Sequence, residues 1–348
     1  MLLKRRNVLF GLAGFSGALV VSSCTNSQNN ATSTSESNQS ESGMPEKIRI
    51  GYQVSANAEL LVKALGLAET AFGDTTVEYI NFKSGRDVNT AMASGGIDVG
   101  LIGSVGVAVG IAQNLPYQPY FIHSIIGEAE ALAVKDNINS ISDLRGKKIA
   151  VPFGSTSHFT LLSLLSLENI AENELTILDL QPQDLVAAWQ RGDIDGGYIW
   201  YPNLPKLVND GGTILVTSAE MADKGVVTAD LGVVRQEFAD SYPEAMKKYV
   251  GVLDEAVEFY RQSPEEAGAK IAPELGISPE ESLEAMNKLI WLTSSEQADP
   301  KYLGTPDNVG NFAQVLEESA KFMVTQKNIS SAPDLQAYQS AIRNDFLS

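Results

Sequence analysis

The chain has one cysteine, Cys24, and two histidines, His123 and His158, among its 348 residues. A single cysteine excludes an intramolecular disulfide, and a zinc site needs three or four ligands, which these residues do not supply. The sequence also lacks a Walker loop, a G-x-G-x-x-G fingerprint and a G-x-S-x-G nucleophile elbow. We therefore expect no enzyme activity, no metal ion and no cofactor.

Positive charge is scarce as well. Lys and Arg number 25 against 43 Asp and Glu, which gives a net charge of −18. Nucleic-acid binding depends on basic surfaces, so this balance excludes nucleic acid as a partner. An excess of one sign also keeps a secreted protein from associating, and we expect a monomer.

The N-terminus carries an export signal. Residues 4–6 are basic (KRR), and residues 8–21 form an apolar run that is too short to span a membrane. The run ends in VSSC, residues 21–24, which resembles a bacterial lipobox. We predict a lipoprotein signal peptide over residues 1–23 and lipidation of Cys24.

The segment that follows the cysteine cannot build a core. Residues 25–43, TNSQNNATSTSESNQSESG, contain no large apolar side chain. We predict a flexible tether over residues 24–45. The folded part then lies outside the cytoplasm, lipid-anchored to the membrane at the periplasmic face or the cell surface.

From residue 47, strand and helix signals alternate, which predicts an α/β fold with a mostly parallel sheet. The alternation contains an internal repeat. Residues 91–102 (AMASGGIDVGLI) and 188–199 (AWQRGDIDGGYI) share Ala, Gly, Ile-Asp, Gly and Ile at an offset of 97. The strands at 48–52 and 149–153 match in the same order at an offset of 101. One α/β lobe is therefore predicted twice.

Two similar lobes imply a cleft between them. In open α/β sheets, ligands bind beyond the carboxyl ends of the strands. The segments predicted to line the cleft are therefore the turns that follow these strands, at residues 53–58, 103–105, 154–157 and 200–202.

After residue 235 the pattern is nearly all helical. An apolar stripe runs from Met246 to Tyr260, and S-P-E-E at 263–266 and 278–281 predicts two capping boxes. Thr305-Pro306 predicts one more helix start. Since these helices need a surface to cover, we assign residues 46–134 and 231–348 to lobe 1 and residues 135–230 to lobe 2. Two crossings between the lobes form a hinge.

Residues 148–165, KIAVPFGSTSHFTLLSLL, predict an anion-binding site. A strand over 149–153 leads through the turn 154–157 into a helix from about His158. The first N–H groups of a helix have no intrahelical acceptor, and the macrodipole is positive there. One of Ser155, Thr156 and Ser157 caps the helix, and the others are left for a ligand.

Two carboxylates lie in apolar surroundings, Glu130 in EALAV and Asp230 in TADLGVV. A buried carboxylate needs a partner. The partner is either nearby backbone or, if both face the cleft, the ammonium group of a ligand. Tyr198 and Trp200 approach the end of a strand, where aromatic rings can cover a ligand.

These residues together carry a family resemblance. AVPFGSTSHFTLL at 150–162 and AWQRGDIDGGYIWYP at 188–202 resemble the taurine-binding proteins of bacterial ABC importers, within the aliphatic-sulfonate, nitrate and taurine group. The resemblance covers residues 47–345. It implies a periplasmic-binding-protein-like type II fold, with two α/β lobes, a hinge and a ligand cleft between them. The partners implied are a small zwitterionic or anionic solute and an ABC permease with its ATPase.

The resemblance also implies roles for individual residues. The sulfonate would lie on the turn and helix of Ser155, Thr156, Ser157 and His158, while Glu130 and Asp230 face the amine. Gln53, Ser104 and Trp200 fall at further contact positions. The chain departs from the family after Asp230, where Leu231-Gly232 replaces a bulky aromatic residue. The missing ring predicts a wider pocket and a larger aminosulfonate.

We therefore expect a lipid-anchored binding protein for taurine or a related aminosulfonate. The alternative within the same fold is a binder of a small anion without an amine, such as nitrate or an aliphatic sulfonate. An enzyme of the thiamine-precursor-synthase type is disfavoured, because its metal-binding cysteines are absent.

Overall fold

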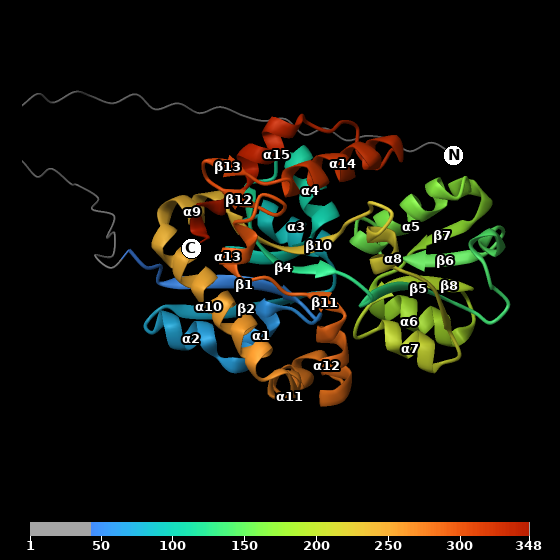
Figure 1. The fold of residues 1–348 in the computed structure, drawn as a ribbon, viewed down its shortest axis with the longest axis horizontal. Coiled ribbons are helices and arrows are strands. Elements are labelled where there is room, and N and C mark those ends of the chain that lie inside the picture. Colours follow the sequence, from blue (N-terminus) through green and yellow to red (C-terminus); the bar gives the residue numbers. More distant parts are fainter. Residues whose placement is uncertain (1–42, 348) are drawn as a thin grey trace, which may run out of the picture. The chain divides into compact units, whose positions relative to one another are not determined.

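Two β-sheets organise residues 43–347, the part of the chain that the computed structural model describes (Figure 1). The predicted signal peptide, Cys24 and most of the tether lie outside these residues. The six-stranded sheet has the order β11-β4-β10-β3-β1-β2, and the five-stranded sheet has the order β7-β6-β8-β5-β9. The strands are β1 (Lys47–Gln53), β2 (Thr76–Phe82), β3 (Val99–Gly103), β4 (Tyr117–Ile126), β5 (Glu130–Val134), β6 (Lys148–Val151), β7 (Thr176–Asp179), β8 (Gly196–Trp200), β9 (Thr213–Thr217), β10 (Ala229–Arg235) and β11 (Leu289–Ile290).

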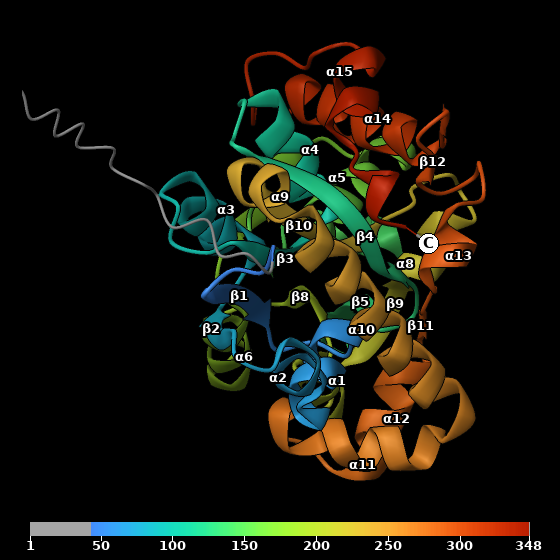
Figure 2. The same ribbon diagram turned by 90° about the vertical axis from the view of Figure 1, so that its left-hand side faces the viewer.

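Helices cover both faces of the six-stranded sheet, as Figure 2 shows. One layer contains α1 (Ala58–Leu65), α2 (Leu67–Phe72), α9 (Gln236–Ser241), α10 (Pro243–Gln262), α11 (Pro264–Leu275) and α12 (Pro279–Asn287). The other contains α3 (Gly85–Ala93), α4 (Ser104–Ala112), α14 (Phe312–Thr325) and α15 (Leu335–Ala341). The short helix α13 (Ser294–Gln297) and the hairpin β12 (Gly304–Thr305) and β13 (Asn308–Val309) join these layers, and η3 (Asn344–Phe346) is the last element described.

The five-stranded sheet is sandwiched in the same way. Along β5, Leu132 and Val134 face the cluster under α5 (Thr156–Leu167) and α8 (Ser218–Ala222), while Ala131 and Ala133 face α6 (Pro182–Arg191) and α7 (Leu204–Asn209). This alternation follows from the two-residue period of a strand. The 3-10 turns η1 (Ile141–Leu144) and η2 (Glu172–Glu174) complete this part.

The predicted duplication is confirmed by the sheets. The order β2-β1-β3-β10-β4 repeats as β7-β6-β8-β5-β9, with the first three strands parallel and the last two pairings antiparallel in both. Ile50 pairs with Val99, and Ile149 pairs with Gly196. The first strands therefore correspond at an offset of 99 rather than 101. A shift of two residues keeps every side chain on its predicted face.

The division into two lobes stays a prediction, which the two separate sheets support. If the sheets mark the lobes, the first crossing precedes Glu130 rather than following Val134, because β5 pairs with β8 and β9. Asp230 lies in β10 and so belongs with the six-stranded sheet. The two crossings touch, since the Ile126 N–H donates to the Thr228 carbonyl at 2.9 Å.

Of the helix and capping predictions near the C-terminus, some are confirmed and others are wrong. The predicted stripe forms α10, and Ser278 makes the predicted capping box with Glu281. The Ser263 side chain does not cap α11, because the residue continues directly from α10 with φ −141° and ψ 62°. Thr305-Pro306 starts no helix. It lies in the β12–β13 hairpin, and α14 begins at Phe312 instead. Among residues 43–347, no helix has the length and apolar character needed to cross a membrane.

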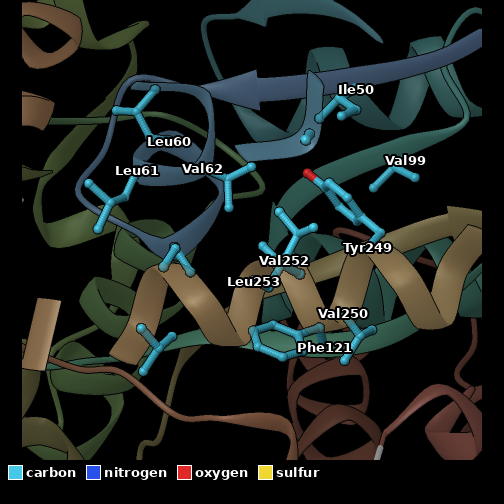
Figure 3. Close-up of a cluster of buried hydrophobic side chains, with 14 of the residues drawn as sticks. Ile50, Leu60, Leu61, Val62, Val99, Phe121, Tyr249, Val250, Val252 and Leu253 are labelled. Atoms are coloured by element: carbon cyan, nitrogen blue, oxygen red, sulfur yellow. The ribbon is translucent and has the colours of Figure 1, made fainter. Parts of the chain in front are cut away.

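The largest core cluster lies between the six-stranded sheet and α1 and α10 (Figure 3). Ile50 and Val99 from the sheet meet Leu60 to Val62 of α1 and Tyr249 to Leu253 of α10. Polar groups are buried at its edge. Glu59 Oε2 lies 3.8 Å from His123 Nε2 and accepts a 3.4 Å hydrogen bond from Tyr249 Oη. Burial raises the pKa of Glu59 to about 8 and lowers the pKa of His123 to about 3. Both groups are therefore uncharged at neutral pH.

This cluster predicts that stability falls as pH rises from about 6.5 to 8. Since the pKa of Glu59 rises from 4.5 unfolded to about 8 folded, the folded state binds the extra proton, and its stabilising effect is lost as pH rises toward 8. His123 opposes this only below its unfolded pKa of 6.5. Between pH 6.5 and 8 the contribution of Glu59 to the unfolding free energy should fall by about 1.4 kcal/mol per pH unit.

Urea denaturation of the wild type and Glu59→Gln across this range checks the prediction. The wild-type unfolding free energy should fall more steeply than that of the variant. Parallel pH dependence in the two proteins would contradict it.

Candidate functional site

A pocket lies at strand ends of both sheets, and its cavity volume is about 50 Å³. All four segments predicted to line the cleft contribute to its wall, which confirms that part of the sequence interpretation. The lining residues are Gln53, Ser55, Ala56, Gly85, Leu101, Ile102, Gly103, Gly106, Ile126, Ala129, Glu130, Gly154, Ser155, Thr156, Trp200, Tyr201, Asp230 and Leu289.

Glu130 is the first residue of β5 and is only 2% exposed. Its Oε2 accepts hydrogen bonds from Thr156 Oγ1 at 2.6 Å and Ser157 Oγ at 2.8 Å, and its Oε1 accepts one from Ser218 Oγ at 2.8 Å. Burial raises the pKa of Glu130, while the three hydroxyl donors pull that pKa down. The pocket thus contains a buried carboxyl whose ionised form is supported by hydrogen bonds.

Asp230 lies at the start of β10, opposite Gly103 of β3 and Ser124 of β4. Among the described residues its side chain accepts one hydrogen bond, from Ser124 Oγ, which is long at 3.4 Å. Burial first, and then the charge of Glu130, raise the pKa of Asp230 to about 7. A cation held between the two carboxyls would lower the pKa of both, because it favours the ionised form of each.

The three hydroxyls predicted to bind an anion instead make hydrogen bonds within the protein. The helix α5 begins at Thr156 rather than near His158, since Ser155 is already its N-cap. Ser155 Oγ accepts from the His158 N–H and donates to the Pro152 carbonyl. Thr156 and Ser157 donate to Glu130. The expectation of spare hydroxyls is therefore wrong, because Glu130, whose closeness to α5 the linear sequence does not show, takes two of them.

Backbone groups still favour an anion at this pocket. The helices α3, α4 and α5 all begin at its wall, through Gly85, Gly103 and the segment Gly154 to Thr156. The N-caps of α3 and α4 make no side-chain capping hydrogen bond. Their first N–H groups and positive dipole ends are therefore suited to a ligand's acidic group.

Three predicted residues do not line the pocket. Ser157 points to Glu130, and Ser104 is fully buried, where its Oγ accepts from the Ala229 N–H at 3.2 Å. His158 stacks on the Phe153 ring at 4.4 Å, and its Nδ1 accepts from the Gly154 N–H. Burial lowers the pKa of His158 to about 4, so it supplies no positive charge at neutral pH.

Gln53 and Trp200 do line the pocket as predicted. The Gln53 Nε2 donates to the Leu101 carbonyl at 2.9 Å, which fixes the amide at the wall. Trp200 stands opposite Glu130 in the β5–β8 pairing, and Tyr201 adds a second ring. Tyr198 is fully buried in the core instead.

The departure at Leu231-Gly232 does not widen the pocket. Leu231 is buried in the core, and a Cβ on Gly232 would point at Tyr120 and at His123 Nε2, 2.9 Å away. Neither residue lines the pocket. The predicted widening is therefore wrong.

Three long-range side-chain contacts were not predicted from the sequence. Ser218 supplies the third donor to Glu130, and the T-x-x-E pattern of its capping box, Thr217 to Glu220, marks a helix start there. Arg86 Nη1 donates to Asp179 Oδ2 at 2.8 Å, and Tyr201 Oη donates to Glu284 Oε1 at 3.0 Å. No local pattern signals such pairs, which are 93 and 83 residues apart.

Comparisons with known proteins agree with this geometry. The family described as NMT1/THI5 like matches residues 74–267. The taurine-binding periplasmic protein of Escherichia coli (strain K12) is 33% identical over 299 residues, which cover 84% of this chain and 90% of that protein.

Solved structures show the same fold at lower identity. The alkanesulfonate-binding protein SsuA of Xanthomonas axonopodis pv. citri, bound to MOPS, has a TM-score of 0.70 and 21% identity, covering 86% of this chain and 98% of that one. The desulfurization enzyme DszB has a TM-score of 0.62 and 15% identity, covering 87% and 98%. The periplasmic-binding-protein-like fold is thus confirmed.

Proposed function

The chain belongs to the NMT1/THI5-like family, and we propose that it is the solute-binding component of an ABC importer for taurine or a related small aminosulfonate. The observation that carries the proposal is one pocket lined by two carboxyls, the buried Glu130 and the partly buried Asp230, and by three helix starts. A zwitterion matches both, because its ammonium pairs with the carboxyls and its acid group meets free N–H donors. The 33% identical taurine-binding relative supports the same solute class.

The remaining site assignments belong to this proposal. We place the acidic group at the starts of α3 and α4, which face the pocket through Gly85 and Gly103, and the ligand's methylene groups against Trp200. Ser157 and Ser218 act through Glu130 rather than on the ligand. Ser104 and His158 support the wall from behind.

We further propose an extracytoplasmic monomer that is lipidated at Cys24 and docks on a transmembrane permease with its ATPase. The periplasmic relative supports the location. We infer binding rather than catalysis, since that relative is a binding protein. The shared fold alone does not decide this, because a desulfurization enzyme has it too. The alternative of an anion without an amine is favoured by the alkanesulfonate-binding neighbour and by relatives described as putative aliphatic sulfonates-binding proteins.

A thermal-shift screen with taurine, 1-propanesulfonate, nitrate and amino acids tests the proposal. Taurine should raise the melting temperature by a few degrees at concentrations well above Kd, because a ligand that binds only the folded state stabilises it. In 1-propanesulfonate a methyl group replaces the ammonium, so a smaller shift is expected. A large shift with nitrate and none with taurine would refute the aminosulfonate assignment.

A further inference from the structure

The two carboxylate oxygens of Glu130 accept different numbers of hydrogen bonds. Its Oε2 receives two hydroxyls from the first turn of α5, while its Oε1 receives only Ser218 Oγ. Removal of one α5 hydroxyl would leave another on the same oxygen. Removal of Ser218 would leave Oε1 without a hydrogen bond from the described residues.

Ser218 is held rigidly where it makes this contact. It is the first residue of α8 and is 1% exposed. The preceding residue, Thr217, caps the helix in a reciprocal box with Glu220, which fixes the backbone at this point. Ser218 does not line the pocket, so any effect on a ligand passes through Glu130.

A second hydroxyl, that of Tyr198, extends the Ser218 hydrogen bond into a chain. Tyr198 Oη lies 3.1 Å from Ser218 Oγ and is also fully buried. An ionised carboxylate only accepts, and a serine hydroxyl has one proton to donate. When Glu130 is ionised, the chain must therefore run from Tyr198 to Ser218 to Glu130. Such a chain strengthens its last hydrogen bond.

We propose that Ser218 is a positioning residue that, relayed by Tyr198, holds Glu130 ionised and oriented for the ammonium group of the solute. This inference rests on the proposed function and deepens it. Ser218 then determines how strongly the pocket prefers a ligand with an amine, although it does not touch that ligand.

Taurine titrations by calorimetry at several pH values between 6 and 9 test this proposal. Ser218→Ala should raise the taurine Kd about 10-fold at pH 7, the value of one hydrogen bond to a charged group. Loss of a donor also raises the pKa of Glu130, so the pH below which affinity declines should move upward. Tyr198→Phe, which leaves the serine in place, should change both in the same direction by less. Ser282→Ala is the matched control, because in the described part of the chain this buried serine donates only to the Ser278 carbonyl.

The outcomes separate the two proposals. A wild type that binds neither taurine nor 1-propanesulfonate refutes the proposed function and this inference with it. Wild-type taurine binding with unchanged affinity and pH profile in both variants refutes the inference alone. Weakening by Ser218→Ala that is equal at every pH also refutes it, since that result indicates a merely structural role. If Ser218→Ala does not fold, Tyr198→Phe decides by the same criteria.

Discussion

Replacement of Asp230 by alanine should reduce taurine affinity by about 100-fold or more while leaving 1-propanesulfonate binding unchanged or tighter. The reason is charge pairing in a buried site, where loss of one partner of an ion pair costs about 2–5 kcal/mol. Within residues 43–347, Asp230 receives only a 3.4 Å hydrogen bond from Ser124, so the ligand's ammonium is its best partner. The same isolation predicts that the ligand-free variant is at least as stable as the wild type, because a partly buried carboxyl with a poor hydrogen bond is gone.

The pH dependence of binding gives this prediction a second readout. Since the pKa of Asp230 is raised to about 7, the ligand-free pocket takes up a proton as pH falls below that value, and the ammonium must displace it. Wild-type taurine affinity should therefore fall on acidification from pH 8 to 6, and less steeply in Asp230→Ala. Calorimetry measures both effects.

Glu59→Gln serves as the control for Asp230→Ala, because it alters a buried carboxyl that does not line the pocket. It should leave taurine affinity unchanged. Equal losses of taurine and 1-propanesulfonate in Asp230→Ala would contradict the assigned role, because they would indicate damage to the whole pocket.

Substitution of Gly103 by alanine should weaken taurine binding by about 10-fold or more without unfolding the protein. Gly103 lies at the end of β3 with φ −58°, which any residue adopts, so its backbone does not require glycine. An added Cβ would lie 2.9 Å from Thr156 Cγ2 of α5. Overpacking of this kind costs about 1–3 kcal/mol, and opening at the proposed hinge would relieve it at the expense of ligand binding.

A second substitution that removes the contact between residue 103 and Thr156 should restore taurine binding. Thr156→Ser deletes the Cγ2 methyl and keeps the hydroxyl that donates to Glu130. The double variant Gly103→Ala, Thr156→Ser should therefore recover most of the affinity, and Thr156→Ser alone should bind almost normally. A double variant as weak as Gly103→Ala would show that the clash with Thr156 is not the cause.

Much of the fold was accessible from the sequence because its signals are local or repeated. Strand and helix alternation predicted an α/β fold, and two matched segments predicted the duplicated sheet. The cleft-lining turns followed, since strand ends in a parallel sheet meet at one edge. Glu130 and Asp230 stood out as charges in apolar runs, and the family resemblance pointed to the same pair.

Only the tertiary structure decided which of these groups form hydrogen bonds with one another. The sequence alone determined that Ser155, Thr156 and Ser157 open a helix at the cleft. It did not determine that Glu130, 26 and 27 residues away, takes two of those hydroxyls, or that Ser218, 88 residues away, supplies a third. Hydrogen-bond partners are chosen by distance in space, and a buried carboxyl takes the nearest donors because leaving it unpaired is costly.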